Sequence, residues 1–436
     1  MDAVQQETPP ASAGDISRLA DHLFRAEAGK LVSVLTSIFG IERLQLAEDV
    51  VQEAMVRALK TWPYYGIPKN PAAWLTQTAK NLALDLIRRE KVFHDKQPQI
   101  IATFEQWPEE SGQHAAQFET EIKDDRLRLM FTCCHPQIAH EDQTALALKT
   151  LCGFGTIEIA KAFLSTEAAV AKRLVRARQK VRELKIPFEI PAGEELSARL
   201  DGVLQTLYLL FNEGYKASSG ESLIREELCH EAIRLGTQLA EHPAGNQPRT
   251  HALVALMCLN AARLRSRVDT DGNLLRLKEQ DRATWDQRMI ARGIFHLAQS
   301  AAGNAISEYH LQAGIAACHC AAQDYESTDW RQILGLYDQL VQLDSSPVIA
   351  LNRAVALAKV GGPRAGIEAV ESICNRKALD AYYLLYAVLG EFELQLRDFD
   401  AAAQHFRKAL EFIEVKSERE FLSKRLRECE DAQLVA

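Results

Sequence analysis

The sequence predicts an all-α protein, and three of its features lead to that prediction. Apolar residues recur at helical spacing in successive segments of the first half. Residues 156–185 read as two helices around a tight turn, and the second of them is strongly basic. From Trp330 onward the chain shows a repeat of about 33 residues, which is typical of paired antiparallel helices.

Length and composition bound the organisation of the chain. A chain of 436 residues is too long for one hydrophobic core, so we expect two or three domains. Contents of 47% hydrophobic and 25% charged residues are ordinary for a soluble globular protein. Because no apolar run reaches membrane-spanning length and no secretion leader is present, we expect a cytoplasmic protein with no membrane partner.

Charge divides the chain unevenly. The net charge is −8, yet residues 1–185 contain 24 Lys or Arg and 24 Asp or Glu. The remainder therefore carries the whole negative charge. A polyanion such as nucleic acid would be repelled by this second part, so any nucleic-acid contact is expected in the first part.

The segment 156–185 gives the most specific functional signal. Thr156 is a candidate N-cap for the short first helix, Leu164 and Ser165 form the turn, and Thr166 is placed to cap the second helix. The second helix has an apolar stripe and a basic outer surface that includes Lys172, Arg173 and Arg176. This arrangement predicts a helix-turn-helix that enters the major groove of DNA. A solvated amphipathic helix in an ordinary bundle is the alternative.

Three helices are predicted before this segment. The first covers 15–39 and follows a polar stretch, 1–14, that is expected to be disordered. The second covers 44–61, with Leu46, Val50, Ala54 and Leu59 near one face and Trp62-Pro63 as its stop. The third covers 70–90, with Asn70 as its cap and Pro71 at its first position.

These segments together resemble a known family. The run AEDVVQEAMVRAL, the run PAAWLTQTAKNLALDLIRR and the helix-turn-helix look like a sigma factor of RNA polymerase, of the sigma-70 family. In particular they resemble the extracytoplasmic-function (ECF) type, which keeps regions 2 and 4. The resemblance covers about 15–185, and the long remainder resembles the subgroup with a C-terminal extension that ends in tetratricopeptide-like (TPR-like) repeats.

The resemblance implies partners and site residues. Core RNA polymerase and promoter DNA would be the partners, and no cofactor or metal is implied. The residues that match the polymerase-binding helix are Glu48, Asp49, Gln52 and Glu53. Those that match the −10 contacts of region 2 are Lys80, Asn81, Arg88 and Arg89, with the loop from Trp62 to Asn70 offering aromatic faces for an unstacked base. Those that match the −35 contacts of region 4 are Ala169, Lys172, Arg173 and Arg176.

The resemblance and the composition divide the chain into six segments. They are a disordered N-terminus at 1–14, region 2 at 15–96, an acidic linker at 97–123, region 4 at 124–186, a helical middle domain at 192–325 and TPR-like repeats at 326–436. Helices are expected near 331–343, 347–360, 363–374, 379–396 and 399–413. The repeats would offer a groove for a protein or peptide partner, or serve only as structural packing.

No catalytic motif is found, so we expect no enzyme activity. A Gly-rich phosphate loop, an HExxH motif and a nucleophile elbow are all missing, and the nine cysteines show no CxxC spacing. In the middle domain, polar residues line a pocket or form a satisfied buried network: Asn212, Glu213, Asp281, Arg282 and His319.

The sequence therefore predicts an ECF-type sigma factor that recruits core polymerase, melts promoter DNA and is regulated by its C-terminal extension. A helix-turn-helix repressor or activator with a repeat-built effector domain is the alternative. A repeat scaffold whose basic helix is incidental is a third possibility. We expect the extension to be required for initiation, because the short link at 185–193 keeps it close to region 4.

Overall fold

The protein is all-α in the computed structural model, which describes residues 13–89, 125–163, 165–186, 188, 194–217, 224–243, 245–270, 273–413 and 415–435. Within these residues the β pairing is limited to one isolated bridge, between Val268 and Leu274. The all-α prediction is confirmed. The acidic linker at 97–123 and residues 1–12 of the predicted disordered N-terminus lie outside the described residues.

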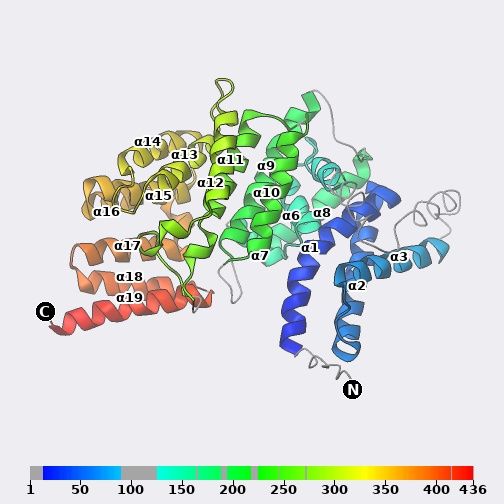
Figure 1. Cartoon of the computed structure of the whole chain (residues 1–436), viewed down its shortest axis with the longest axis horizontal. Coiled ribbons are helices and arrows are strands. Elements are labelled where there is room, and N and C mark those ends of the chain that lie inside the picture. The colour runs from blue at the N-terminus through cyan, green and yellow to red at the C-terminus, as the bar shows by residue number, and fades with distance from the viewer. Residues whose placement is uncertain are drawn as a thin grey trace, which may run out of the picture. The chain divides into compact units, whose positions relative to one another are not determined.

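The chain forms two compact units, residues 1–206 and 207–436. Figure 1 labels their helices along the chain. Unit 1 also contains the 3-10 helix η1 (Ile41–Arg43) and a helical stretch at 125–133. The α-helices of unit 1 are α1 (Ala13–Phe39), α2 (Leu44–Tyr65), α3 (Pro71–Arg89), α6 (His140–Leu151), α7 (Thr156–Ala162), α8 (Glu167–Leu184) and the first part of α9 (Glu194–Tyr215).

The core of unit 1 joins segments that are distant in sequence. Trp62 is 1% exposed and lies between Phe24 of α1 and Trp74 of α3, with ring centroids 6.1 and 5.6 Å away. Further along α1, a Cβ added to Gly29 would lie 2.0 Å from the carbonyl oxygen of Leu151 in α6. Only glycine permits this approach, so α1 packs on both the α2–α3 pair and α6.

The second helix differs from its prediction in two ways. It continues through Pro63 to Tyr65, so the prediction that Trp62-Pro63 would stop it is wrong. A proline in the last turn removes a single backbone hydrogen bond, and Gly66, at φ 80°, ends the helix. Leu59 is 45% exposed and does not belong to the apolar face, because the buried stripe follows Ala54, Ala58 and Trp62.

The first part of α9 belongs to unit 1. A Cβ on Gly202 would lie 2.9 Å from the sulfur of Cys134, and Arg199 donates a hydrogen bond to the carbonyl oxygen of Phe131. Thr144 donates to the side chain of Gln205 at 3.0 Å. The first unit therefore extends beyond the basic helix α8 and ends inside α9.

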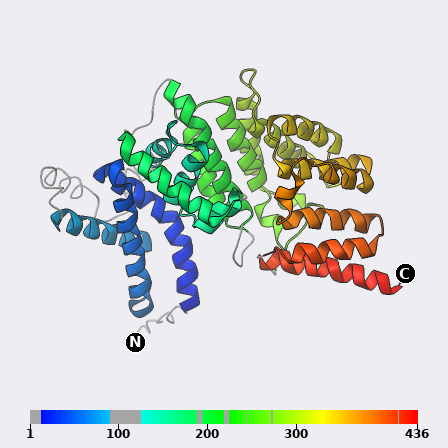
Figure 2. The ribbon, with the colours of Figure 1, turned by 180° about the vertical axis from the view of Figure 1, so that it is seen from behind.

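Unit 2 is a succession of helices, each packed on the next (Figures 1 and 2). Within its described residues, 3-10 helices interrupt this succession at η3 (Leu264–Arg267), η4 (Leu277–Glu279), η5 (Arg282–Thr284) and η6 (Arg376–Leu379). The α-helices after α9 are α10 (Glu226–Glu241), α11 (Pro248–Ala261), α12 (Gln287–Ser300), α13 (Glu308–Ala321), α14 (Trp330–Leu343), α15 (Pro347–Gly361), α16 (Pro363–Glu371), α17 (Tyr383–Gln395), α18 (Phe399–Leu410) and α19 (Lys416–Val435). The five helices predicted after residue 330 correspond to α14–α18.

Small residues allow these helices to pack closely. Ala354 is fully buried in the core that α15, α16 and α17 share. A Cβ on Gly390 of α17 would lie 2.7 Å from the ring of Phe406 in α18. Ala354 and Ala387 are small residues one repeat length apart in the sequence, and both contact hydrophobic clusters.

Candidate functional site

The two helices α7 and α8 are fixed to each other at the turn between them. Thr166 caps α8 by accepting a hydrogen bond from the backbone N–H of Ala169, as predicted. Thr156 is the first residue of α7, not its cap, because the chain enters the helix at Gly155, whose N–H bonds to Glu158. The Thr156 hydroxyl instead donates to the carboxylate of Glu167 in α8 at 2.6 Å.

The apolar stripe of α8 is buried as its spacing predicts, at Val170, Leu174, Ala177 and Val181. The other side of the helix carries the predicted −35 residues. Lys172 is exposed, and Ala169 is half-buried in the first turn. The surface of α8 therefore keeps the basic character seen in the sequence.

Two arginines of this surface are held by acids of α6. Arg176 makes two hydrogen bonds to the carboxylate of Asp142, at 3.1 and 2.9 Å, and these raise its pKa. Arg173 pairs with Glu141 and lies over the ring of Phe163 at 5.7 Å. The Arg173 side chain is 18% exposed and that of Arg176 is 61% exposed, so Arg176 is the more accessible of the two.

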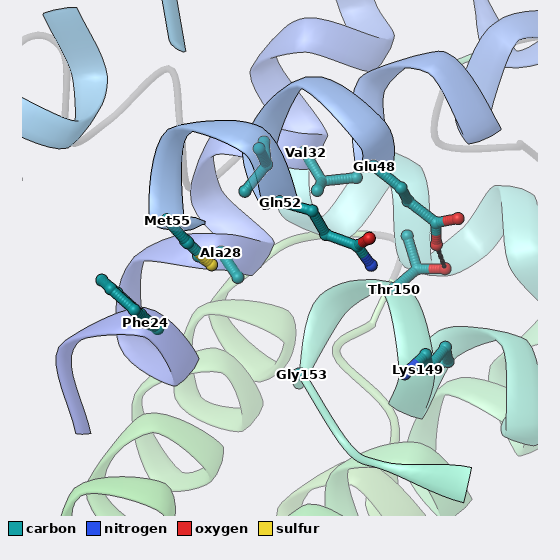
Figure 3. A pocket seen from close by; sticks show the side chains of 10 residues that line it. Phe24, Ala28, Val32, Glu48, Gln52, Met55, Lys149, Thr150 and Gly153 are labelled. Atoms are coloured by element: carbon teal, nitrogen blue, oxygen red, sulfur yellow. Dashed lines mark hydrogen bonds between the residues drawn. The ribbon is translucent and has the colours of Figure 1, made fainter. Parts of the chain in front are cut away.

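A third arginine of α8 reaches α2. Arg178 donates to the carboxylate of Glu48 at 2.9 Å, and Thr150 of α6 donates to the same carboxylate at 2.8 Å. Glu48 is 7% exposed, and Figure 3 shows its bond to Thr150. Of the four predicted polymerase-binding residues, Glu48 is thus the one whose side chain bonds to other helices of unit 1.

The other three predicted polymerase-binding residues are exposed on α2. Asp49 accepts a hydrogen bond from Gln45 at 2.9 Å, and Glu53 pairs with Arg57 at 3.1 Å. Gln52 lines a cleft of about 210 Å³ whose other walls are shown in Figure 3. The lining residues are Phe24, Ala28, Val32, Glu48, Val51, Gln52, Met55, Lys149, Thr150 and Gly153.

Two exposed apolar side chains extend this face of α2. Val56 is 39% exposed and Leu59 is 45% exposed. Together with Asp49, Gln52 and Glu53 they follow helical spacing, so polar and apolar groups share one side of the helix. Val56 was not predicted on this face, because the helical spacing of apolar residues does not separate a buried from an exposed apolar stripe.

The predicted −10 residues lie along α3. Asn70 caps the helix by accepting from the N–H of Ala73, as predicted. Asn81 is exposed and accepts a hydrogen bond from Gln77, while Lys80 is 5% exposed. Arg88 and Arg89 are exposed in the last turn, and Arg88 lies 3.9 Å from Asp85.

Only part of the aromatic segment before α3 is accessible. Trp62 is in the core, so its indole is not available for a base, contrary to the expectation for this loop. Tyr64 and Tyr65 are 84% and 86% exposed and end α2. The helical spacing of Ala54, Ala58 and Trp62 is the sequence signal that could have assigned Trp62 to the core.

Most of the polar residues predicted to form a pocket or a buried network in the middle domain make ion pairs or hydrogen bonds. Glu213 pairs with Arg225 at 3.0 Å, and Asp281 caps η5 through the N–H of Ala283. Arg282 donates to two backbone carbonyls, and Asn212 is half-buried. His319 differs from these residues, because its Nδ1 is buried without a hydrogen-bond partner.

The cysteines are free thiols. Burial raises the pKa of Cys134 and of Cys152 to about 12, and it also raises that of Cys133. Over the part of the chain that the structure describes, no three His, Cys, Asp or Glu side chains come together as a metal site requires. Every described helix is too short or too polar to cross a lipid bilayer.

Two segments of the chain match known families, and one relative matches most of its length. Residues 23–92, which include most of α1 and all of α2 and α3, match the family described as Sigma-70 region 2. Residues 199–301 match a family of unknown function (DUF6596). A protein of Rhizobium meliloti (strain 1021), described as uncharacterized, is 36% identical over 385 residues, which is 88% of this chain and 90% of that protein. No solved structure matches the chain.

The match on α1–α3 identifies residues 23–92 as a sigma-70 region 2, which supports a sigma-70 factor as the class of the protein. The chain belongs to one family with the rhizobial protein over nearly its whole length.

Proposed function

We propose that the protein is an ECF-type sigma factor that recruits core RNA polymerase and opens promoter DNA. One observation carries this proposal: the Sigma-70 region 2 match falls on α1–α3 and is followed by a short helix, a tight turn and a basic helix. Region 2 followed by a helix-turn-helix is the minimal set of parts that recognises two promoter elements.

Within this proposal, the exposed face of α2 binds the polymerase. Asp49, Gln52 and Glu53 supply polar contacts, and Val56 adds apolar area beside them. Glu48 contributes through the same helix, but its carboxylate is free for a partner only after it leaves Arg178 and Thr150.

The promoter contacts are divided between α3 and α8. Asn81, Arg88 and Arg89, with Lys80, bind the −10 element, and Tyr64 and Tyr65 stack on a base that leaves the duplex. Lys172, Arg173 and Arg176 contact base edges or phosphates of the −35 element, with Ala169 close to the groove floor.

The C-terminal extension, in this proposal, regulates initiation through TPR-like repeats. Its support is the sequential packing of α14–α18, which follows the predicted helix pairs, and the repeat spacing of Ala354 and Ala387. A protein or peptide partner would bind in the groove of these repeats.

The test is transcription with purified core polymerase. Adding the chain should produce promoter-specific transcripts, and the chain without polymerase should bind duplex promoter DNA weakly. A chain that binds an operator tightly by itself and never supports initiation is a helix-turn-helix repressor or activator, which would reject the proposal. Binding that does not depend on salt would instead indicate that the basic helix α8 plays no part in DNA contact.

A further inference from the structure

Three arginines of unit 2 come together near the C-terminal end of α11. Arg263 precedes η3, Arg267 ends η3, and Arg282 begins η5. Burial lowers the pKa of both Arg267 and Arg282, and the positive charge of Arg263 lowers them further, so the three guanidinium groups lie close enough to interact. Arg267 and Arg282 are only 8% and 9% exposed.

Two of these guanidinium groups share one aromatic ring. Arg267 lies over the ring of Tyr215 at 3.8 Å from the centroid, and Arg263 lies at 5.5 Å. Arg267 also donates to the backbone carbonyl of Tyr215. The hydroxyl of Tyr215 is buried and has no hydrogen-bond partner.

The third arginine, Arg282, bonds to the backbone of His319, whose ring contains a second buried atom without a hydrogen-bond partner. Arg282 is fixed by the carbonyl oxygens of His319 and Ala322, at 2.8 and 2.9 Å, and by the hydroxyl of Thr328 at 2.8 Å. These partners are neutral, so the charge remains. Burial and the charges of Arg263 and Arg282 lower the pKa of His319 to about 3, so the ring is neutral, and its buried Nδ1 has no partner.

The described residues offset the charge of this cluster only in part, because the carboxylates of Asp324 and Glu418 act on Arg282 and Arg267 without forming direct ion pairs with them. No carboxylate among them lies within ion-pair distance of Arg263, Arg267 or Arg282. Glu418, whose charge acts on Arg267, is already bonded to Lys216 at 3.3 Å and to the hydroxyl of Tyr383. The C-terminal end of α11 offsets part of the charge of Arg263, but a helix dipole amounts to about half a charge.

Buried cations are normally paired, because an uncompensated buried charge is costly. Buried donors are likewise normally satisfied. Here three cations without a direct carboxylate partner lie with two buried donors that have no hydrogen-bond partner, which is the composition expected of an empty anion site. The half-buried Arg263 is the member that solvent can reach.

We propose that unit 2 holds a binding site for the anionic group of a small molecule, a carboxylate or a phosphate, with Arg263 as its main ligand. Arg267 and Arg282 flank the anion, and the Tyr215 hydroxyl and the Nδ1–H tautomer of His319 donate hydrogen bonds to it. All of these residues except His319 lie within the segment matched by the family of unknown function, 199–301. The residues of this site are other than those proposed for the promoter and polymerase contacts, so this proposal does not depend on the proposed function.

The test uses the purified full-length chain and calorimetric titration at pH 7.5. Inorganic phosphate and citrate serve as separate probes, with sodium chloride at matched ionic strength as the reference. We expect saturable binding of at least one probe; phosphate alone identifies a phosphate-bearing ligand and citrate alone a carboxylate. Loss of a charged hydrogen-bond donor predicts that Arg263→Gln weakens binding at least about tenfold.

Matched variants separate a site from general charge effects. Arg265→Gln removes an exposed arginine of the same turn and should leave binding unchanged. Tyr215→Phe removes only the unpartnered hydroxyl, so it should fold as the wild type does and bind the anion several-fold more weakly. In anion-free buffer, Arg263→Gln should raise the thermal unfolding midpoint, because it removes an uncompensated charge.

The proposal is overturned if neither probe binds beyond the chloride reference, or if Arg265→Gln weakens binding as much as Arg263→Gln does. It is also overturned if Arg263→Gln binds as the wild type does, or if this variant lowers the unfolding midpoint without anion, since the arginine would then be a structural residue.

Discussion

The carboxylate of Glu48 in α2 and the guanidinium of Arg178 in α8 form an ion pair at 2.9 Å across 130 residues of sequence. The side chains are 8% and 21% exposed, so the pair is largely removed from water. Thr150 completes the hydrogen bonding of the carboxylate. The segment that matches Sigma-70 region 2 and the basic helix thus share a polar contact inside unit 1.

Glu48→Gln should destabilise unit 1 markedly. Removing one partner of a buried pair leaves the other charge uncompensated and costs about 3 kcal/mol of unfolding free energy. The urea unfolding midpoint measures the change. Glu53→Gln breaks the exposed pair with Arg57 on the same helix and should cost less than about 0.5 kcal/mol. Equal effects of the two substitutions would show that the Glu48–Arg178 pair does not stabilise the fold.

Lys172→Ala should weaken promoter binding by the polymerase complex. A base contact predicts a loss of about 1–3 kcal/mol and relaxed preference at one position, while a phosphate contact predicts a uniform loss and a smaller salt slope. Lys180→Ala, on the same helix but paired with Glu183 at 3.7 Å, is the control and should have little effect. Binding isotherms at several salt concentrations measure both. A wild-type isotherm for Lys172→Ala would remove this residue from the −35 contact.

Tyr64→Ala and Tyr65→Ala should lower transcription from duplex promoters without changing stability. Both rings are exposed, so their loss should alter the unfolding free energy by less than about 0.5 kcal/mol. Loss of stacking on one base costs about 1–3 kcal/mol of promoter opening. Trp62→Ala, in contrast, should destabilise unit 1 by about 3–5 kcal/mol, because its ring is in the core. Run-off transcription beside urea unfolding distinguishes the two cases, and undiminished transcription by both tyrosine variants would show that neither ring holds a base.

Unit 2 should lose stability as the pH falls from 6.5 to 4, and His296 should account for part of that loss. Burial, with the charges of His251 and Arg292, lowers the pKa of His296 from 6.5 to about 4, and its Nδ1 lies 2.9 Å from that of His251. In this range the unfolded chain binds a proton that the folded chain does not, so stability is full above pH 6.5. The loss for this group is at most about 3 kcal/mol.

The measurement is the unfolding free energy of the wild type and of His296→Gln between pH 7.5 and 4. The variant should show a shallower decline with falling pH. His230→Gln, which changes an exposed histidine, should follow the wild type. Parallel curves for the wild type and His296→Gln would contradict the assignment.

A chain that ends after Pro191 should be less stable than one that ends after Thr206. The shorter chain lacks the first part of α9, whose Leu200, Val203 and Leu204 are fully buried. Burial of each such side chain contributes about 1.5–3 kcal/mol, so the difference amounts to several kcal/mol. Circular dichroism and limited proteolysis of the two truncations measure it. Equal protection from protease would show that α9 is not part of the first folding unit. Only a truncation that folds is suited to testing whether the extension is required for transcription.

The sequence by itself determined the all-α class and most of the helices, because helical spacing, caps and breakers are local signals. Asn70, Thr166 and the stripe from Val170 to Val181 lie where these signals place them. Local signals do not report which of two apolar stripes faces the core, so Leu59 and Trp62 were assigned to the wrong environments. The exposed Tyr64 and Tyr65 became distinct from Trp62 only through packing.

Tertiary structure alone decided which charged residues are available for partners. The predicted polymerase-binding face of α2 includes Glu48, Asp49, Gln52 and Glu53. Of these residues only Glu48 forms an ion pair with an arginine from a distant helix. The arginines of α8 are divided in the same way by Glu141, Asp142 and Glu48. The sequence also did not predict the arginines beside Tyr215 that lack a direct ion pair. Whether an ion pair forms depends on distances of a few ångströms between segments that are far apart in the chain.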